Sequence, residues 1–248
     1  MANVPLMCVD TVVIYQYRHG GSIISVTSKL YSNGGILRFY RGVIPFVINK
    51  PINKMSCAMV NDLALEAFQG STAPKLLKTM AASTAASLCS LLLLPMDAWK
   101  CIKQIEGQDG FQKLLDKSGK YKSAPWHGVC AQVAERSVSN YPWFFMYNLL
   151  GERMPTFQFE HGKHVRNALI GFASSFVSDV VSNPFRVLKT VRQTSLVPIS
   201  YRDAAKEVVE TSGLRGLAFR GLPLRILGNG MSGAIFTILW RAYQDRQK

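Results

Sequence analysis

The sequence is poor in acidic residues and in histidine. Its 248 residues include 15 Asp and Glu against 29 Lys and Arg, a formal net charge of +14, and only 4 histidines. His19 and His127 lie in polar stretches, as do His161 and His164, and only the last two are close enough in sequence to suggest a metal site. Solvated loop histidines explain that pair more simply. We therefore expect no enzyme, no bound metal and no cofactor.

The sequence also lacks a cysteine framework and a targeting segment. All five cysteines lie in or beside apolar segments: Cys8, Cys57, Cys89, Cys101 and Cys130. None forms a C-x-x-C pair, so neither a disulfide framework nor a zinc site is indicated, and we expect mostly buried thiols. The N-terminal stretch MANVPLMCVD is too short and too poor in basic residues for a cleaved signal or a transit peptide.

Charge is nearly absent from two long runs. The run Thr79–Pro95 contains no charged residue, and the run Asn167–Val181 contains only Asp179. Runs of this kind approach the length needed to cross a bilayer core about 30 Å thick, which indicates membrane spans. A buried helix of a soluble protein is the alternative for either run alone, and it weakens when several such runs recur at regular intervals.

The basic residues gather in the polar stretches after every second apolar run. One set is Lys100, Lys103, Lys113, Lys117, Lys120 and Lys122, and another is Arg186, Lys189, Arg192, Arg202, Lys206, Arg215 and Arg220. The alternate connections are poorer in basic residues. A nucleic-acid partner would call for a basic face beside aromatic readers, which is not this pattern. The alternation follows the positive-inside rule instead, and places the basic connections on one side of a membrane.

Three stretches of the sequence align with a period of roughly 90 residues. They read CVDTVVIYQY from Cys8, PMDAWKCIKQ from Pro95 and PFRVLKTVRQ from Pro184, and each is followed by an aromatic-x-Gly element: FYRG, WHG and FRG. Each unit contains two apolar segments joined by a basic connection. The six segments lie near Met1–Arg18, Val43–Phe68, Pro74–Ile105, Val129–Met154, Val165–Ser195 and Leu222–Gln244. A proline inside a helix removes a hydrogen bond, so bends are expected at Pro95 and Pro184.

PMDAWKCIKQ and PFRVLKTVRQ resemble the Pro-x-acid-x-x-base signature of the mitochondrial carrier family, in which a Gln follows four residues after the base. SGLRGLAFRG and NGGILRFYRG resemble the Gly-to-aromatic-basic-Gly element of the same family. The resemblance implies an all-α protein with six transmembrane helices in three pseudo-threefold repeats, each with a short amphipathic helix on the matrix side. It implies one domain over residues 1–248, with repeats at about 1–70, 71–155 and 156–248, in the mitochondrial inner membrane with the basic connections facing the matrix.

The resemblance also assigns a gate on the matrix side, in which an acid of one odd-numbered helix pairs with a base of the next. The implied pairs are Asp10 with Lys100 and Asp97 with Lys189, supported by Gln104 and Gln193. The third pair is missing, because Arg186 occupies the acid position and Val13 the base position, while Tyr17 replaces the third Gln. We therefore expect an unpaired Arg186 that needs lipid, water or another chain.

The gate at the other, cytosolic end resembles aromatic-acid-x-x-base in active members. The three sites here read Asn61-Asp62-x-x-Leu65, Tyr147-Asn148-x-x-Gly151 and Trp240-Arg241-x-x-Gln244. Asp62 and Tyr147 are the remnants of this gate, and every base is missing. The resemblance therefore implies that no ring of ion pairs forms at this end.

The family contacts its substrates seven residues after each aromatic-x-Gly glycine. The candidates here are Asn49 and Lys50, Glu135 and Arg136, and Gly228 and Asn229. Charged residues at membrane depth are costly unless paired or hydrated, so Glu135 and Arg136 indicate either a functional site or a mutual ion pair, and both interpretations stay open. Cardiolipin is the expected structural lipid, and its candidates are Arg41, Gly42, Gly128, Arg220 and Gly221. Simple capping of helices by glycine is compatible with that assignment.

Only seven residues precede Cys8, so the first helix is expected to be truncated if Met1 is the true start. The truncation leaves a gap between the second and sixth segments, and we expect partner subunits near the first, second and sixth segments. We therefore favour an accessory or structural subunit of a larger, respiratory-chain-type assembly in the inner membrane, with eroded transport machinery. The alternative is an active solute carrier that moves an anionic metabolite by alternating access.

Overall fold

The structure, a computed structural model, describes residues 4–68, 75–122, 126–155, 157–158 and 162–232, except for some side chains inside helices. Every regular element in these ranges is helical, which confirms the all-α prediction. The α-helices are α1 (Met7–His19), α2 (Ile23–Ser32), α3 (Val43–Ala67), α4 (Lys75–Cys89), α5 (Leu94–Glu106), α6 (Gly110–Lys120), α7 (Val129–Arg153), α8 (Gly162–Thr194) and α9 (Tyr201–Phe219). Short 3-10 turns are η1 (Ile36–Tyr40), η2 (Ser90–Leu93) and η3 (Gly107–Asp109), and residues 222–232 are also helical.

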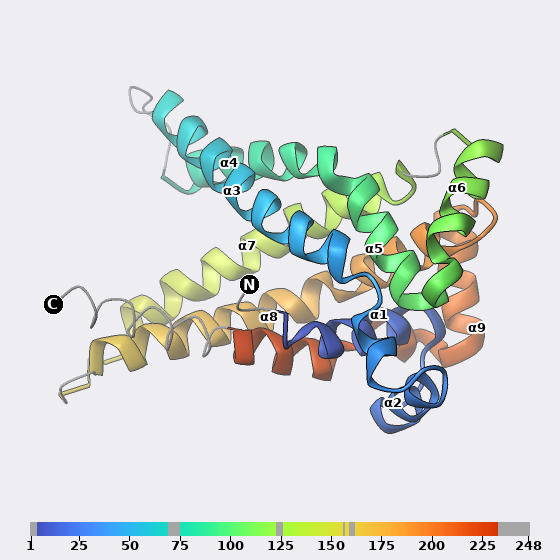
Figure 1. The fold of residues 1–248 in the computed structure, drawn as a ribbon. Coiled ribbons are helices and arrows are strands. Elements are labelled where there is room, and N and C mark those ends of the chain that lie inside the picture. Colours follow the sequence, from blue (N-terminus) through green and yellow to red (C-terminus); the bar gives the residue numbers. More distant parts are fainter. Residues whose placement is uncertain (1–3, 69–74, 123–125, 156, 159–161, 233–248) are drawn as a thin grey trace, which may run out of the picture.

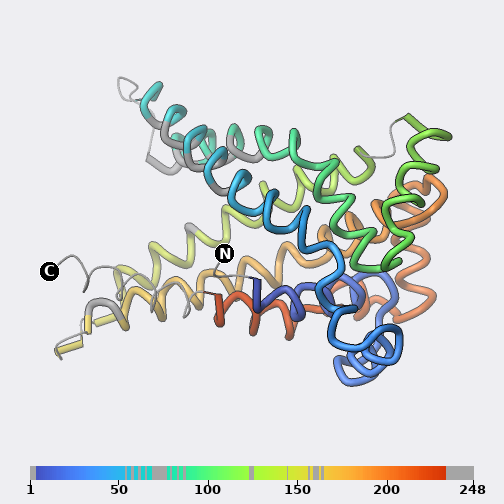
Figure 2. The backbone as a smooth tube through the Cα atoms, viewed as in Figure 1, coloured from blue at the N-terminus to red at the C-terminus, as the bar shows by residue number. Residues whose placement is uncertain are grey.

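The helices fall where the apolar segments predict them. The two pairs α3 with α4 and α7 with α8 are long neighbours that spread apart at one end and approach α1 and α5 at the other (Figures 1 and 2). There α1, α5 and α8 contact one another pairwise. Helices α2, α6 and α9 lie beyond that end, where the resemblance implies short amphipathic helices (Figure 1).

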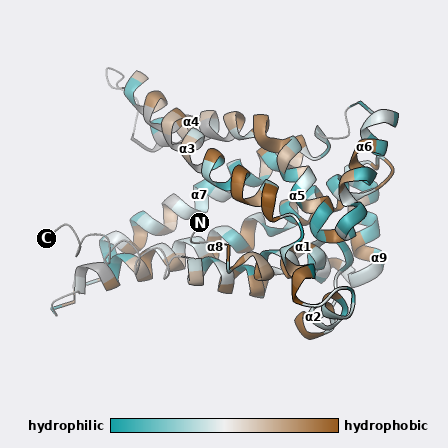
Figure 3. Ribbon diagram, viewed as in Figure 1, coloured by the Kyte–Doolittle hydropathy of each residue, from teal (hydrophilic) through white to brown (hydrophobic). Residues whose placement is uncertain are grey.

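The hydropathy of the helices is uneven. Hydrophilic residues gather on α6 and α9, whereas α3 carries hydrophobic residues along its middle (Figure 3). Within the residues that the structure describes, no helix combines the length and the apolar character that a membrane span requires. The six predicted spans therefore stay a prediction.

The two signature prolines affect their helices differently. The 3-10 turn η2 separates α4 from α5 directly before Pro95, as expected where proline removes a hydrogen bond. Pro184 lies inside α8, which continues as one helix of 33 residues. The first helix, α1, has 13 residues, but residues 1–3, on which its predicted truncation depends, lie outside the described ranges.

The buried core lies where α1, α8 and α9 meet. Val13 and Tyr17 of α1 are about 1% exposed and belong to one apolar cluster with Val187 of α8 and Val208 of α9. Burial of aliphatic and aromatic side chains contributes about 1.5–3 kcal/mol each. The core therefore holds the first helix of the chain against its last third.

Three glycines make equivalent close contacts with the signature helices. Gly42, Gly128 and Gly221 all have positive φ angles, of 95°, 100° and 65°. A Cβ on them would lie 3.3 Å from the carbonyl oxygen of Lys100, 3.5 Å from that of Lys189 and 3.2 Å from that of Val13, respectively. These carbonyls belong to the three aligned base positions, so each aromatic-x-Gly element packs against the signature of the following unit, and the third packs against the first.

Three cations contact the C-terminal ends of the same helices in the same cyclic order. Arg38 donates to the carbonyl oxygens of Gln104 (2.8 Å) and Ile105 (2.6 Å) at the end of α5. Lys117 donates to carbonyl oxygens at the end of α8, and Arg220 donates to the Tyr17 carbonyl oxygen near the end of α1. A cation at a helix C-terminus is favourable because it opposes the negative end of the helix dipole.

Lys117 gives these contacts a dependence on pH. Its Nζ lies 3.1 Å from the Gln193 oxygen and 2.5 Å from the Ser195 oxygen, and burial together with the charges of Arg18 and Arg192 lowers its pKa from 10.5 to about 8. Between these pH values the unfolded chain binds the proton and the folded chain does not, so this residue makes the free energy of unfolding rise with pH.

We expect Lys117→Met to remove this part of the rise in stability between pH 8 and 10.5. Denaturant unfolding of the purified protein at several pH values in that window measures it. The control is Lys120→Met, an exposed position of the same helix, which should keep the wild-type slope. Identical slopes for Lys117→Met and wild type would contradict the assignment.

Candidate functional site

A cavity of about 430 Å³ lies between the helices, where the three aligned stretches on α1, α5 and α8 meet. Its walls come from α1, α3, α5, α7, α8 and the helical residues 222–232. The lining includes Asp10, Asp97, Lys100 and Lys189 of the predicted matrix gate. All six substrate-contact candidates line it as well: Asn49, Lys50, Glu135, Arg136, Gly228 and Asn229. The structure thus brings the two predicted sets of residues to one cavity.

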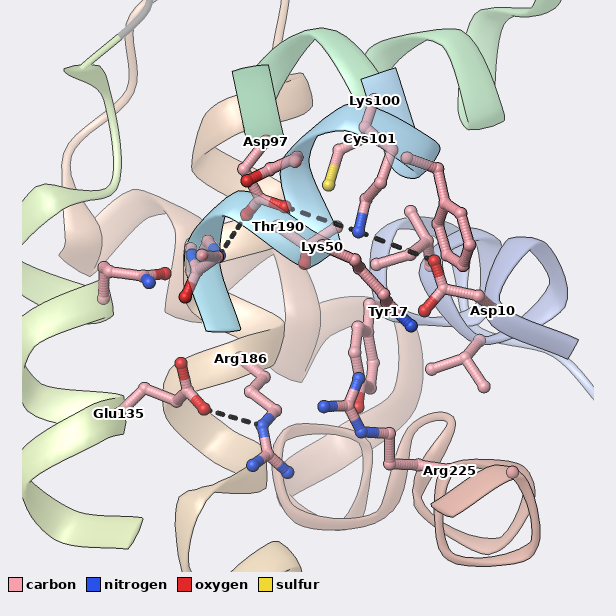
Figure 4. Close-up of a pocket in the computed structure, with 18 of the residues that line it drawn as sticks. Asp10, Tyr17, Lys50, Asp97, Lys100, Cys101, Glu135, Arg186, Thr190 and Arg225 are labelled. Atoms are coloured by element: carbon pink, nitrogen blue, oxygen red, sulfur yellow. Dashed lines mark hydrogen bonds and ion pairs between the residues drawn. The ribbon is translucent and has the colours of Figure 1, made fainter. Parts of the chain in front are cut away.

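One side of the cavity carries a chain of four alternating charges (Figure 4). Lys100 Nζ lies 3.5 Å from Asp10 Oδ2 and 3.3 Å from Asp97 Oδ1, and Lys189 Nζ contacts Asp97 Oδ2. Asp97 therefore accepts from both lysines and links α5 to α8, while Lys100 links α5 to α1. The pairs that the signatures imply are together, and their action as a gate stays a prediction.

The two glutamines that follow these pairs have different surroundings. Gln104 Nε2 donates to Asp10 Oδ2 (3.1 Å) and to the Thr11 hydroxyl (3.2 Å). Gln193 is 1% exposed, and neither its side-chain oxygen nor its nitrogen has a partner among the described residues. The residue that follows the acid explains part of the difference, because it is Thr11 in the first unit and Ala98, without a hydroxyl, in the second.

This difference predicts opposite effects of one substitution. Gln104→Leu should lower the free energy of unfolding by about 1–3 kcal/mol, because it removes two hydrogen bonds and leaves buried groups without partners. Gln193→Leu should be neutral or stabilising, because its amide is buried and makes no hydrogen bond. Denaturant titration of both variants measures the difference, and equal losses would contradict it.

Arg186 is paired, so the expectation of an unpaired arginine is wrong. Its Nε lies 2.9 Å from Glu135 Oε1 of α7, and its Nη1 lies 2.6 Å from Asp179 Oδ1, two turns earlier on α8. Asn229 Nδ2 donates to the other oxygen of Asp179 at 2.6 Å. Arg186 lacks a partner on α1, where Val13 lies, and these four side chains join α7, α8 and the helix at 222–232 instead.

A neutral hydrogen bond joins α1 to α8 where the third ion pair is missing. The Tyr17 hydroxyl donates to Asn183 Oδ1 at 3.0 Å, and both residues are 1% exposed or less. The amide nitrogen of Asn183 donates to the carbonyl oxygens of Ala218 (2.8 Å) and Arg220 (3.1 Å). The α1–α8 contact therefore depends on hydrogen bonds and on the apolar core.

The substrate-contact candidates on the long helices are mostly engaged with other side chains. Glu135 contacts Arg186, and not Arg136, so the mutual pair considered for these neighbours does not form. Arg136 Nη2 instead lies 3.5 Å from Asn53 Oδ1, and the Lys50 ammonium lies 4.4 Å from the centre of the Phe46 ring. Asn49 is buried, and Gly228 adds no side chain to the lining.

Gln132 and Arg225 are among the lining residues that the sequence interpretation missed. Gln132 and Arg225 line the same cavity, one helical turn before the predicted contact positions on their helices. Gln132 follows Gly128 by four residues, and Arg225 follows Gly221 by four. Looking four residues after each glycine, as well as seven, would have identified them. Asp179 and Asn183 were also missed as partners, although a helical count of seven places Asp179 on the face of α8 that carries Arg186.

The described part of the cytosolic gate contains no ion pair. The Tyr147 ring stacks on Trp143, with 5.0 Å between ring centroids, and Trp143 donates to Ser175 of α8. The side chains of Asn61, Asp62 and Leu65 lie outside the described set, as do residues 233–248 with Trp240, Arg241 and Gln244. No interaction of Asp62 is therefore assigned.

The cardiolipin candidates differ in their availability. Arg220 is 7% exposed, and its guanidinium donates to Ser212 Oγ (2.7 Å) and Thr211 Oγ1 (2.5 Å), so its donors face the protein interior. Arg41 is partly exposed and lies against Gly107, next to the N-terminus of α6. Gly42, Gly128 and Gly221 make the close helix contacts described above. Of the two arginines, Arg41 is thus the more exposed, and cardiolipin binding stays a prediction.

The comparison with known families agrees with this geometry in the last third of the chain. The model described as mitochondrial carrier protein matches residues 160–246, which contain α8, α9 and Gly221. This last third of the chain is thus similar to the mitochondrial carrier family. No curated protein matches the chain. The matched residues thus combine a family signature with a partly altered set of charges.

Proposed function

We propose that this chain is an accessory or structural subunit of a larger, respiratory-chain-type assembly in the mitochondrial inner membrane. The observation that carries the proposal is the cluster of Arg186, Glu135, Asp179 and Asn229. It uses two substrate-contact candidates and a gate position for fixed contacts among α7, α8 and the helix at 222–232. A buried charge pair is costly to separate, so this cluster opposes the relative movement that alternating access requires.

The other gate supports the same proposal. Asn148 and Gly151 of α7 occupy an acid and a base position, and neither side chain carries a charge. Leu65 and Gln244 occupy the other two base positions. With no basic residue at any of the three base positions, the ring of ion pairs that the family forms at this gate cannot be built. A structural subunit, which acts through its fold and its contacts, does not need a gate that opens and closes.

The proposal includes one carrier domain over residues 1–248, with three repeats, basic connections facing the matrix and cardiolipin as a structural lipid. The contacts of Gly42, Gly128 and Gly221 support it, because they relate each unit to the next in cyclic order. The contacts of Arg38, Lys117 and Arg220 with the ends of α5, α8 and α1 support it as well. Partner subunits near α1, α3 and the helix at 222–232 belong to the proposal.

A second candidate function is active transport of an anionic metabolite. It is favoured by the charged cavity, and by the chain Asp10–Lys100–Asp97–Lys189, which keeps two of three matrix pairs. These pairs, whose side chains are 11–21% exposed, have to break in each transport cycle. In this alternative the Arg186 cluster has to open as well.

Native electrophoresis of mitochondria solubilised in mild detergent tests the proposal, with mass spectrometry to locate the chain. We expect it to migrate with an assembly far larger than its own 27.6 kDa. Purified protein in liposomes should then show no uptake of anionic metabolites. The structural role would be overturned if the chain migrated by itself and the purified protein took up anionic metabolites. Loss of this uptake in a matrix-gate variant such as Asp97→Asn would then establish the second candidate.

A further inference from the structure

The connection between α1 and α3 carries an exposed apolar surface. It consists of Ile23, Ile24 and Tyr31 of α2 and of Ile36 and Leu37 of η1, which contacts α2, and we call it the α2–η1 surface. Ile24 and Leu37 are 83% and 80% exposed, and Ile36 and Tyr31 are 68% and 60% exposed. Apolar side chains that gather in this way mark an interaction site, whereas single ones do not.

Helices α2 and α9 are equivalent in register, so their outward faces can be compared position by position. Ser22 and Ser200 cap their N-termini, and each hydroxyl accepts from the backbone N–H three residues later, at 3.2 Å and 3.1 Å. The residues four and eight places after each cap are buried: Val26 and Leu30 in α2, and Ala204 and Val208 in α9.

The two outward faces differ in charge. Helix α9 carries four exposed charged side chains where α2 carries one apolar and three hydroxyl side chains: Arg202, Asp203, Lys206 and Glu210 correspond to Ile24, Ser25, Ser28 and Ser32. Counted back from Gly42 and Gly221, Ile36 and Leu37 correspond to Arg215 and Gly216. Figure 3 shows the same contrast, with hydrophobic residues on α2 and hydrophilic residues on α9.

This contrast distinguishes a protein from a lipid surface as the partner of α2. The contacts of Gly42, Gly128 and Gly221 relate the units in cyclic order, and α2 and α9 both lie beyond the end where α1, α5 and α8 meet (Figure 1). A lipid surface at that level would also cover the outward face of α9, whose carboxylates need water and are repelled by anionic headgroups. A partner that covers the first unit alone is therefore a protein.

The charge around the α2–η1 surface is of one sign. Residues 11–61 include no Asp or Glu, and the exposed Lys29 lies on α2 between Ile24 and Tyr31. Opposite charges at the rim of an interface favour encounter and fix its orientation. An apolar centre with a basic rim thus fits a partner whose own rim is acidic.

We infer that the α2–η1 surface docks a protein subunit whose contact area is apolar at its centre and acidic at its rim. This inference rests on the proposed role of the chain as a subunit of a larger assembly. It adds a contact at the basic connections, outside the long helices. Tyr31 suits the centre of such an interface, because its ring gives apolar area and its hydroxyl can form a hydrogen bond.

The test gives the α2–η1 surface the residues of the third unit. Ile24→Arg combined with Ile36→Arg copies Arg202 and Arg215, and all four positions are exposed, so the purified variant should keep the wild-type thermal midpoint. In mitochondria that express it in place of wild type, the fraction that migrates with the large assembly on native gels should fall about tenfold or more, because two charges face an apolar partner. Leu214→Arg on α9, at a position 78% exposed, is the matched control and should migrate as wild type does.

A change of the rim charge tests the chemistry of the partner. Lys29→Glu should lower the fraction in the assembly about fivefold, whereas Lys29→Arg should leave it unchanged. A photo-crosslinking phenylalanine derivative in place of Tyr31 should attach to one protein subunit within the assembly band. Attachment to phospholipid alone would overturn the inference in favour of a lipid surface.

Wild-type migration of the double variant would overturn the inference and leave the subunit role in place. If the thermal midpoint of that variant falls, the two Lys29 variants decide instead, and equal migration of both would overturn the inference. If the wild-type chain itself migrates alone, the subunit role fails and the inference fails with it. The wild-type and variant lanes of one gel thus separate the two failures.

Discussion

Replacing Arg186 by Met should lower the free energy of unfolding by about 3–5 kcal/mol, the largest effect that we expect from a single substitution. The side chains of Arg186, Glu135 and Asp179 are 11%, 12% and 6% exposed. Removal of the guanidinium leaves two carboxylates close together in a poorly solvated place. Their mutual repulsion and their loss of hydration then add to the loss of two ion pairs.

Compensating substitutions test this reason. In Arg186→Met combined with Glu135→Gln and Asp179→Asn, no charge stays without a partner, so most of the lost stability should return. Arg215→Met, an exposed position on α9, is the matched control and should change the free energy of unfolding by less than about 0.5 kcal/mol. Denaturant unfolding in detergent measures all three proteins. A loss from Arg186→Met that the triple variant does not recover would contradict the cluster.

Asp97→Asn should be the second most destabilising change, with a loss of about 3 kcal/mol. Asp97 contacts both Lys100 and Lys189, whose side chains are only 11% and 14% exposed, so its neutralisation leaves two cations near each other. Asp10→Asn should cost about 1 kcal/mol, because Lys100 keeps its contact with Asp97.

A surface pair provides the control for the Asp97 series. Lys206 and Glu210 lie 3.8 Å apart with side chains 75% and 65% exposed, so Glu210→Gln should not change stability measurably. Unfolding measurements at low and high salt add a second readout. Added salt should weaken the exposed pair more than the pairs of Asp97. Equal losses for Asp97→Asn and Asp10→Asn would show that Asp97 does not serve both lysines.

The sequence predicted the helices and the pairs that depend on a repeated pattern. Apolar segments within the repeats located α3, α7 and α8, and the resemblance to the carrier signatures implied the partners of Lys100 and Lys189. These features recur at a fixed period, so each copy supports the others.

Features that depart from the repeat were harder to predict. The partners of Arg186 come from α7 and from an earlier turn of α8, and Tyr17 meets Asn183, which is 166 residues later in the chain. The repeat does not relate these residues. Helical spacing alone places Asp179 on the face of Arg186, whereas the other partners meet only in the folded chain. The Gln193 amide lacks a partner partly because Ala98 stands where the first unit has the hydroxyl of Thr11, and partly because of the packing around it. A single sequence contains the substitution but not its geometric result.

The hydrogen bond between Tyr17 and Asn183 has a mechanical consequence. The α5 contacts with α1 and α8 contain charged pairs, whose strength falls as ions screen them, whereas a bond between two neutral groups is almost indifferent to ionic strength. When salt rises, the two sides that contain α5 should weaken slightly, because their pairs are mostly buried, while the α1–α8 side keeps its strength. The ring should then open unevenly, with α5 swinging outward and the α1–α8 seam serving as its hinge.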